Sequence, residues 1–214
     1  MRIWTSILLI STILVNSGCQ SVYYDINERM GKHKRDILVE RVEEAQESQE
    51  EAKEQFADAL EAFRATVQVD GGRLQDTYDR LKKEYDSSVR EANDVRGRIG
   101  AVQGVAEALF KEWGSELGDY TNDNLRRASE TQLRATKKEY ENLLKAMQNA
   151  EAKMGPVLAV FHDQVLFLKH NLNARAIASI QNEVTNMERD VASLIEDMNV
   201  AIAEAEAFVR GLKE

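Results

Sequence analysis

Three histidines and a run of glutamates are the side chains that could hold a metal ion. His162 and His170 lie eight residues apart on the most apolar stretch of the chain, and Asp163 follows the first. A metal or proton site is one interpretation, and histidines hydrogen-bonded locally on a helical bundle are the other. The di-iron centres of helical bundles need a glutamate three residues before each of two histidines. Neither these two histidines nor His33 has one, so the sequence lacks that ligand set.

The glutamates recur turn after turn on one face of a predicted helix, at Glu40, Glu43, Glu44, Glu47, Glu50, Glu51 and Glu54. Binding of a divalent cation is one interpretation of this acidic face. In the antiparallel register that a turn at Gly71-Gly72 would set, the face lies beside residues 87–101, which include Arg90, Arg96 and Arg98. We therefore expect ion pairs between helices and solvated side chains there, with no metal and no cofactor.

Cys19 is the only cysteine, and it stands where a lipid could be attached. Met1-Arg2 and the thirteen-residue apolar run Ile3–Val15 have the organisation of a secretory signal, and about 20 Å of helix is short for a hydrocarbon core of about 30 Å. Asn16-Ser17-Gly18-Cys19 resembles the bacterial lipobox, although an aliphatic residue is usual in place of Asn16. The pattern predicts a signal peptide over 1–18, acylation of Cys19 and a lipidated tether over 19–25. A free thiol behind an ordinary signal or an uncleaved anchor is the alternative.

The residue after the cysteine and the charge balance indicate where such a protein would work. Gln20 takes the place where inner-membrane retention typically uses Asp, which favours the periplasmic face of the outer membrane over that of the inner membrane. The formal net charge is −9, and it becomes −10 when Arg2 leaves with the signal. Because nucleic-acid affinity depends on many contacts between basic side chains and phosphates, we expect no nucleic-acid partner.

Four basic residues follow close behind the predicted anchor, at Arg29, Lys32, Lys34 and Arg35. Each basic side chain near an anionic membrane surface contributes about 1 kcal/mol of attraction, so contact with lipid headgroups is one interpretation. A solvated tether is the other. The chain contains no phosphate-binding loop, dinucleotide-binding fingerprint, metalloprotease motif or nucleophile elbow, so we expect no enzyme.

Apolar and small residues recur at alternating spacings of three and four along most of the chain, which is the pattern of paired helices. The first stripe comprises Leu38, Val42, Ala45, Gln49, Ala52, Phe56, Ala59 and Phe63. A second runs from Leu74 to Trp113, after the turn residues Asp70-Gly71-Gly72. The two predict long helices, at about 26–68 and 73–117, that pair as an antiparallel hairpin.

Two further helices are expected after Gly118–Asn124, which contains helix-end and N-cap residues. We place them at about 122–154 and 156–212, because Gly155-Pro156 suits the end of one helix and the first turn of the next. The spacing from Leu172 to Ile180 is eight instead of seven, which predicts a kink or a full break near Asn171–Asn173.

Some helices have apolar or small residues on two faces, which separates a bundle from isolated hairpins. Gly97, Ala101, Gly104 and Ala108 form a second stripe, for which close helix approach and flexibility are the two interpretations, and Val157–Leu168 is too wide for a two-stranded seam. We therefore predict an all-α fold over 26–214, an elongated up-down antiparallel four-helix bundle with coiled-coil hairpins.

Three segments resemble the bacterial lipoprotein family catalogued as domain of unknown function 2959. They are 23–39, with Tyr23-Tyr24-Asp25 and Lys34-Arg35-Asp36-Ile37-Leu38-Val39, then Gln55-Phe56-Ala57-Asp58-Ala59-Leu60, and Leu168-Lys169-His170-Asn171-Leu172-Asn173-Ala174. The resemblance covers essentially all of 19–214. It implies a largely helical lipoprotein of Gram-negative bacteria, and it brings no catalytic residues.

The sequence thus favours a membrane-anchored periplasmic lipoprotein that acts as a structural or protein-interaction bundle. Its expected contacts are the membrane, through the lipidated N-terminus, and a protein partner or a second copy, through helix faces. The alternative is a periplasmic binding module for a small ligand, a lipid or a cell-wall fragment. Its cavity would lie in the bundle interior, near Gly97–Leu109 and Val157–Leu168.

Overall fold

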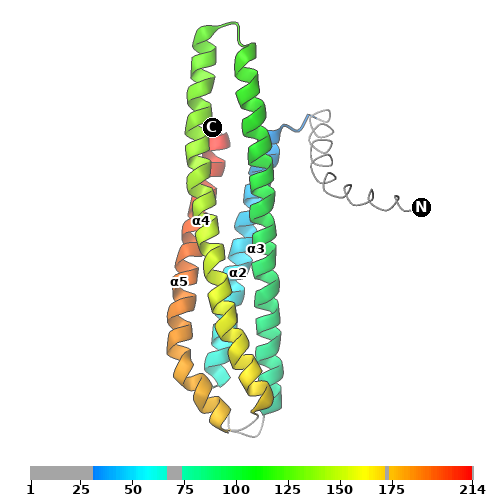
Figure 1. The fold of residues 1–214 in the computed structure, drawn as a ribbon, viewed down its shortest axis with the longest axis vertical. Coiled ribbons are helices and arrows are strands. Elements are labelled where there is room, and N and C mark those ends of the chain that lie inside the picture. Colours follow the sequence, from blue (N-terminus) through cyan, green and yellow to red (C-terminus); the bar gives the residue numbers. More distant parts are fainter. Residues whose placement is uncertain (1–30, 67–73, 172–173, 214) are drawn as a thin grey trace, which may run out of the picture.

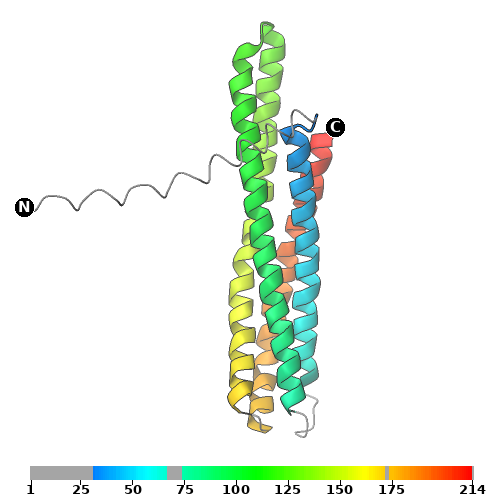
Figure 2. The ribbon, with the colours of Figure 1, turned by 90° about the vertical axis from the view of Figure 1, so that its right-hand side faces the viewer.

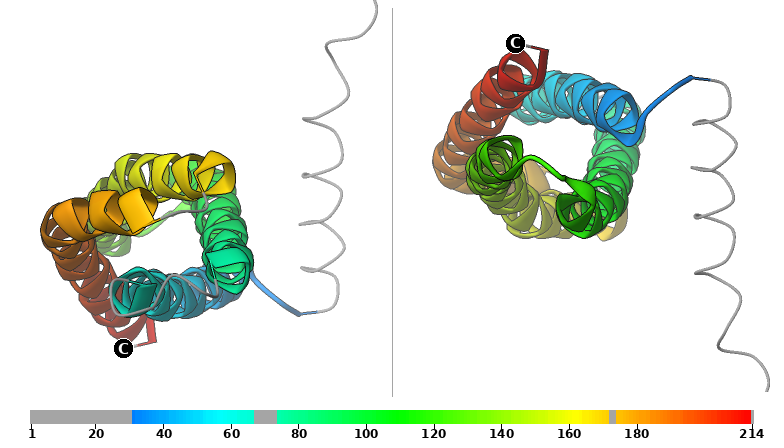
Figure 3. Two further views of the ribbon diagram at one scale, coloured as in Figure 1. Left: turned by 90° about the horizontal axis from the view of Figure 1, so that it is seen from below. Right: turned by 90° about the horizontal axis from the view of Figure 1, so that it is seen from above.

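The protein is an elongated bundle of four long helices (Figure 1). The structure, a computed structural model, describes residues 31–66, 74–171 and 174–213. The helices are α2 (Lys34–Thr66), α3 (Leu74–Glu116), α4 (Asp123–His170) and α5 (Ala174–Lys213), and the short 3-10 helix η1 (Leu117–Asp119) follows α3. Seen end-on, the helices stand at the corners of a square in chain order, with α5 beside α2 (Figure 3). The predicted four-helix up-down bundle is confirmed.

The heptad stripes form the core. Every member of the first stripe is buried in α2, and Leu81, Val95, Val102 and Leu109 are buried in α3. The pairing of α2 with α3 has the expected register: Arg98 donates to Glu44 across 2.8 Å, and Ser48 Oγ donates to Asp94 across 2.9 Å. The turn at Gly71-Gly72 lies outside the described residues, but the helices on both sides of it are aligned as it requires.

The predicted helix boundary at Gly155-Pro156 is wrong, because α4 runs without interruption from Asp123 to His170 with Pro156 inside it. A proline in a helix interior removes a hydrogen bond and costs about 3 kcal/mol. The buried stripe continues across it through Ala150, Met154, Val157 and Phe161. Packing of these side chains on one continuous face offsets the local cost, so the boundary residues do not end the helix.

The chain reverses instead where the heptad spacing slips. Helix α4 ends at His170, and α5 begins at Ala174, so the feature near Asn171–Asn173 is a full break and not a kink within the last helix. Asn171 caps α4: its backbone N–H donates to the carbonyl of Leu168, and its side-chain amide donates to that of Phe167 across 3.0 Å. The expected start near Asp123 is confirmed, because Asn122 is the N-cap and accepts from the N–H groups of Asn124 and Leu125.

The first helix begins later than predicted. Residues 26–30 lie outside the described part of the chain, residues 31–33 are not helical, and α2 starts at Lys34. Gly31 has φ +82°, a left-handed conformation that favours glycine and does not continue a right-handed helix. The N–H of His33 then donates to the Asp36 carboxylate across 3.1 Å, which satisfies one group of the first turn.

The glycine stripe of α3 does not mark a close approach of helices at its first positions. Gly97 and Gly100 are exposed, and a Cβ atom added to either would meet nothing within 4 Å. Gly104 and Ala108 are only half-buried. The core seam of α3 instead passes through Ala92, Val95, Ile99, Val102 and Ala106, so the small residues lie beside the seam.

The core is not uniform along its length. Near the 67–73 end, Phe161 stacks on Phe63 with ring centroids 4.9 Å apart and lies 6.2 Å from Phe56. Between this cluster and the opposite end, the inward positions of α2 include Ala45, Gln49 and Ala52, and Gln49 is fully buried with no hydrogen-bond partner for either amide atom. Small side chains and one orphan amide therefore fill the middle of α2.

At the end of the bundle opposite the phenylalanine cluster, α3 and α4 project beyond α2 and α5 (Figure 2). Helices α3 and α4, joined through η1, extend past the start of α2 and the end of α5. About thirteen residues of α4 lie beyond the end of α5, because Gly211 is level with Glu139, and at about 1.5 Å per residue this is roughly 20 Å. We call residues 113–133 of this projecting hairpin the overhang.

Candidate functional site

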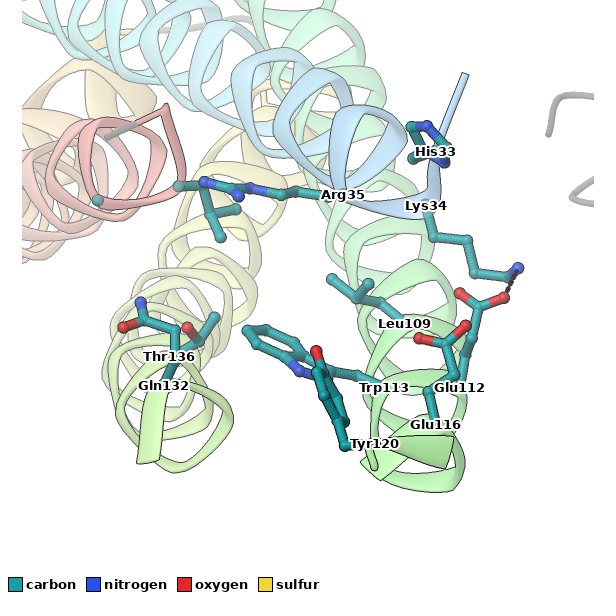
Figure 4. Close-up of a pocket in the computed structure, with 12 residues that line it drawn as sticks. His33, Lys34, Arg35, Leu109, Glu112, Trp113, Glu116, Tyr120, Gln132 and Thr136 are labelled. Atoms are coloured by element: carbon teal, nitrogen blue, oxygen red, sulfur yellow. Dashed lines mark hydrogen bonds and ion pairs between the residues drawn. The ribbon is translucent and has the colours of Figure 1, made fainter. Parts of the chain in front are cut away.

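A cavity of about 430 Å³ lies in the step where the overhang leaves the four-helix bundle (Figure 4). We call it the notch. Helix α2 contributes its first residues, α3 and α4 contribute their overhanging turns, and α5 contributes Gly211 and Leu212 near its end. The notch exists because the four helices differ in length: α2 and α5 stop, and the side chains that they would have covered on α3 and α4 face open space.

One side of the notch is closed by an ion pair between helices. Lys34 Nζ lies 2.8 Å from the Glu112 carboxylate, and Lys34 is only 9% exposed. The pair joins the first turn of α2 to α3 at the level where the overhang begins. In Figure 4 Glu112 and Glu116 stand together on the α3 side.

Two aromatic rings form the part of the notch that belongs to the overhang. Trp113 Nε1 donates to Ser129 Oγ across 2.8 Å, which fixes the indole between α3 and α4. Tyr120, which follows η1, is largely exposed. Figure 4 shows both rings between the α3 wall and the polar side chains of Gln132 and Thr136 on α4. The arrangement offers flat apolar faces beside hydrogen-bonding groups.

Two charged side chains of the notch form no ion pair with any residue that the structure describes. Arg35 reaches from α2 across the notch toward the end of α5, and Glu116 stands on the opposite wall (Figure 4). Both are exposed. With Lys34 and Glu112 paired to each other, one positive and one negative charge remain available on opposite sides of the cavity.

The aromatic end of the core lies directly below the notch. Tyr140 contacts Phe110 and Phe208 with ring centroids 5.4 and 6.3 Å apart. Burial, and to a lesser degree the negative charge of Glu107, raise the pKa of the Tyr140 hydroxyl to about 12. Tyr140 is only 9% exposed, so it belongs to the packed core.

The structure separates the predicted membrane-contact residues. Arg29 lies outside the described residues, as do Cys19, the signal peptide 1–18 and the tether 19–25. Lys32 pairs with Glu40, Lys34 pairs with Glu112, and Arg35 lines the notch. These three residues lie at the end of the rod to which the N-terminal segment leads.

The acidic face of α2 forms ion pairs, but of the three arginines expected beside it only Arg98 contributes, since Arg96 pairs with Glu151 of α4 and Arg90 bonds within α3. Glu44 pairs with Arg41 and Arg98, and Glu43 pairs with Lys213. Partial burial opposes ionisation of Glu44, but hydrogen bonds and the charges of these two arginines outweigh it and lower its pKa.

His162 is engaged locally: its Nδ1 lies 3.5 Å from Asp163 Oδ1, and its ring lies beside that of Tyr85. Within residues 31–66, 74–171 and 174–213, no cluster of three or more His, Cys, Asp or Glu side chains could hold a metal ion.

The sequence reasoning missed the notch. Trp113 belonged to a regular apolar stripe, so the pattern placed it in the core. The stripe of α3 continues to residue 113, but the first apolar partner on α2 is Ile37, and this mismatch could have indicated uncovered positions. The cavity predicted in the bundle interior differs from those observed: the notch includes Leu109, and another cavity borders Pro156 and Val157 beside α5.

Comparisons with known proteins give one match. No curated protein and no solved structure is significantly similar to this chain. None of the helices in the described residues combines the length and the apolar character needed to span a bilayer. The model of one protein family matches residues 23–212, which includes every helix of the bundle and the notch. The chain therefore belongs to the family described as "Protein of unknown function (DUF2959)".

Proposed function

We propose that this protein is a lipoprotein held at the periplasmic face of the outer membrane through acylated Cys19, where its bundle acts as a rigid, non-catalytic interaction module. The observation that carries the proposal is the place where the chain reaches the bundle. Residues just before and in the first turn of α2, His33 to Arg35, line the notch at the overhang end of the rod, so an anchor at Cys19 would hold the rod by this end (Figure 1).

The length of the intervening chain limits how far the rod stands from the membrane. Gly31 comes twelve residues after Cys19, and twelve extended residues span at most about 40 Å. The notch and the overhang would therefore be near the bilayer. The helices of 33 to 48 residues would carry the other end about 50–70 Å away.

Most of the large exposed apolar side chains of the described residues lie at the two ends of this rod, and Val200 stands alone on α5 between them. Tyr120 and Leu125 are on the overhang, and Leu166 and Phe167 are near the end of α4 at the far end of the bundle. Adjacent exposed apolar residues are candidate contacts for another protein. In this arrangement Leu166 and Phe167 would face a partner remote from the membrane.

The anchor is tested by metabolic labelling with a fatty-acid probe. Wild-type protein should take up label and fractionate with the outer membrane, whereas Cys19→Ser should do neither. Gln20→Asp should keep the label and move the protein to the inner membrane, and Ser17→Ala is the matched control that keeps a small residue. Equal fractionation of wild type and Cys19→Ser without label would refute the anchor.

The interaction role is tested in intact cells with a photo-crosslinking residue. At position 167 it should give a discrete crosslinked product, and at Arg189, an exposed polar position on α5, it should give none. Light scattering of the purified protein then separates self-association from a different partner. Identical background at both positions would count against docking through the far end.

The notch favours a second candidate function, binding of a small ligand. It has a volume in the usual range of ligand sites, apolar rings and a few convergent polar groups. The earlier alternatives, a small ligand, a lipid or a cell-wall fragment, all remain open for it. Ligand-dependent melting of the purified protein tests this function, because a ligand at 100 times its Kd adds about 2.7 kcal/mol of stability.

A further inference from the structure

We propose that the notch binds a short zwitterionic peptide, one whose ammonium and carboxylate are both free, through Arg35 on one side and Glu116 with the aromatic rings on the other. This inference rests on the second proposed function, ligand binding at the notch, and it names the chemistry of that ligand.

The balance of charge around the cavity selects the class of ligand. Four charged side chains line the notch, and Lys34 and Glu112 neutralise each other across 2.8 Å. The two that remain are Arg35 and Glu116, and neither has an ion pair in the described part of the chain. A purely anionic ligand would meet Glu116, and a purely cationic one would meet Arg35. A ligand with one charge of each sign can place an opposite charge beside each of the two side chains.

The Arg35 side is suited to a carboxylate. A guanidinium presents parallel donors that match the two oxygens of a carboxylate. Arg35 also lies in the first turn of α2, a helix of 33 residues, and the positive end of a helix favours negative charge nearby. Figure 4 shows its side chain lying over the notch.

The Glu116 side is suited to an ammonium group. Trp113 and Tyr120 place two aromatic rings beside this wall, and a cation over an aromatic face is attracted by the ring quadrupole. The hydrogen bond from Trp113 to Ser129 already holds the indole in place, so the ring loses little conformational freedom on binding. Gln132, on the α4 side across the rings from Glu116, offers an exposed amide to a peptide bond (Figure 4).

Tryptophan fluorescence provides a direct test. The chain has two tryptophans, and because Trp4 belongs to the predicted signal peptide, the emission of the mature protein 19–214 comes from Trp113 alone. We would titrate this purified protein with dialanine, with N-acetyl-dialanine, which lacks the ammonium group, and with dialanine amide, which lacks the carboxylate. Dialanine should change the emission saturably. Each modified probe should bind at least about tenfold more weakly, because each loses a charge-assisted contact.

Variants assign each contact. Arg35→Gln should lower the affinity for dialanine to that of the parent protein for dialanine amide. Glu116→Gln should lower it to that of the parent protein for N-acetyl-dialanine. Arg134→Gln, which removes an exposed arginine paired with Glu130 outside the notch, is the matched control and should bind like the parent. Circular dichroism checks that each variant keeps its helices.

The outcomes separate this inference from the function beneath it. Equal binding of dialanine and its blocked forms, or no saturable change with dialanine at 10 mM, would overturn the zwitterion inference. If a glycan or a phospholipid then raises the melting temperature, the notch still binds ligand and only its chemistry was wrong. If nothing does, ligand binding fails too, whereas the lipid anchor is judged separately by fatty-acid labelling.

Discussion

Helices α3 and α4 run through both the closed bundle and the overhang, yet α4 buries its side chains very differently in the two regions. In the closed part, Phe161, Leu143 and Met147 of α4 have no more than 1% of their surface exposed. On the overhang, Leu125 of the same helix is 57% exposed. The apolar register of α3 continues to Trp113, whereas that of α4 would continue from Leu133 to the polar residues Ser129 and Arg126. The two regions therefore differ both in the presence of α2 and α5 and in the residues of α4.

The comparison shows that a heptad stripe predicts a face, whereas neighbouring helices decide whether that face becomes core. Where all four helices are present, the stripe stabilises the fold by burial. Where two are missing, the corresponding part of α3 is left uncovered, so Trp113 and Glu116 line an open cavity instead of the core.

The largest expected effect comes from removing the ring at the centre of the aromatic cluster. Phe161→Ala should lower the free energy of unfolding by about 3–5 kcal/mol, because it leaves a cavity between Phe56 and Phe63. Leu125→Ala on the overhang should change it by less than about 0.5 kcal/mol, as expected of surface positions. Urea unfolding followed by circular dichroism measures both, and equal losses would contradict the distinction between the regions.

The next effect should appear at the border of the two regions. Glu112→Ala leaves Lys34 nearly buried without this carboxylate and should cost about 1–3 kcal/mol. Lys34→Met in the same chain should recover most of the loss, since it removes the charge and keeps the apolar stem. Thermal and urea unfolding of the two single variants and the double variant give the coupling. If the double variant is no more stable than Glu112→Ala, the ion pair does not define this border.

A smaller effect of opposite sign is expected inside the closed core. Gln49 is fully buried and neither amide atom has a partner, and burial of an unsatisfied polar group costs about 1–3 kcal/mol. Gln49→Leu should therefore raise the free energy of unfolding by about 1–2 kcal/mol. Gln148→Leu, at an exposed position of α4, is the matched control and should give no such gain.

The oligomeric state of Gln49→Leu sharpens the same comparison. A single polar residue on a helical seam can fix the register and the number of helices at a cost in stability. Light scattering should therefore show whether the more stable variant also forms additional species. A loss of stability in Gln49→Leu would contradict the view that the amide is unsatisfied.

Most of the fold could be predicted from the sequence, because the stripe positions that define the core of α2 are local and regular. Leu38 through Phe63 were assigned correctly from spacing alone. Pro156 was misread because local preference favoured a boundary, whereas packing of Met154 and Val157 on one face favours continuity. The notch could not be read from any single stripe, since it depends on where α2 and α5 end relative to Trp113 and Tyr120.

The smallest effect is confined to high pH and tests how closed the core is just below the notch. The pKa of Tyr140 in the folded protein is about 12, above the ordinary value of about 10. Its contribution to stability is therefore complete below pH 10 and is lost as the pH rises from 10 through 12. When the pH is raised from 8 to 11, the free energy of unfolding measured with urea should fall less for Tyr140→Phe than for wild type, because the variant has no hydroxyl to ionise. Tyr120→Phe, on the exposed overhang, should lose as much as wild type, and an identical loss in all three proteins would show that the core is already open to solvent at Tyr140.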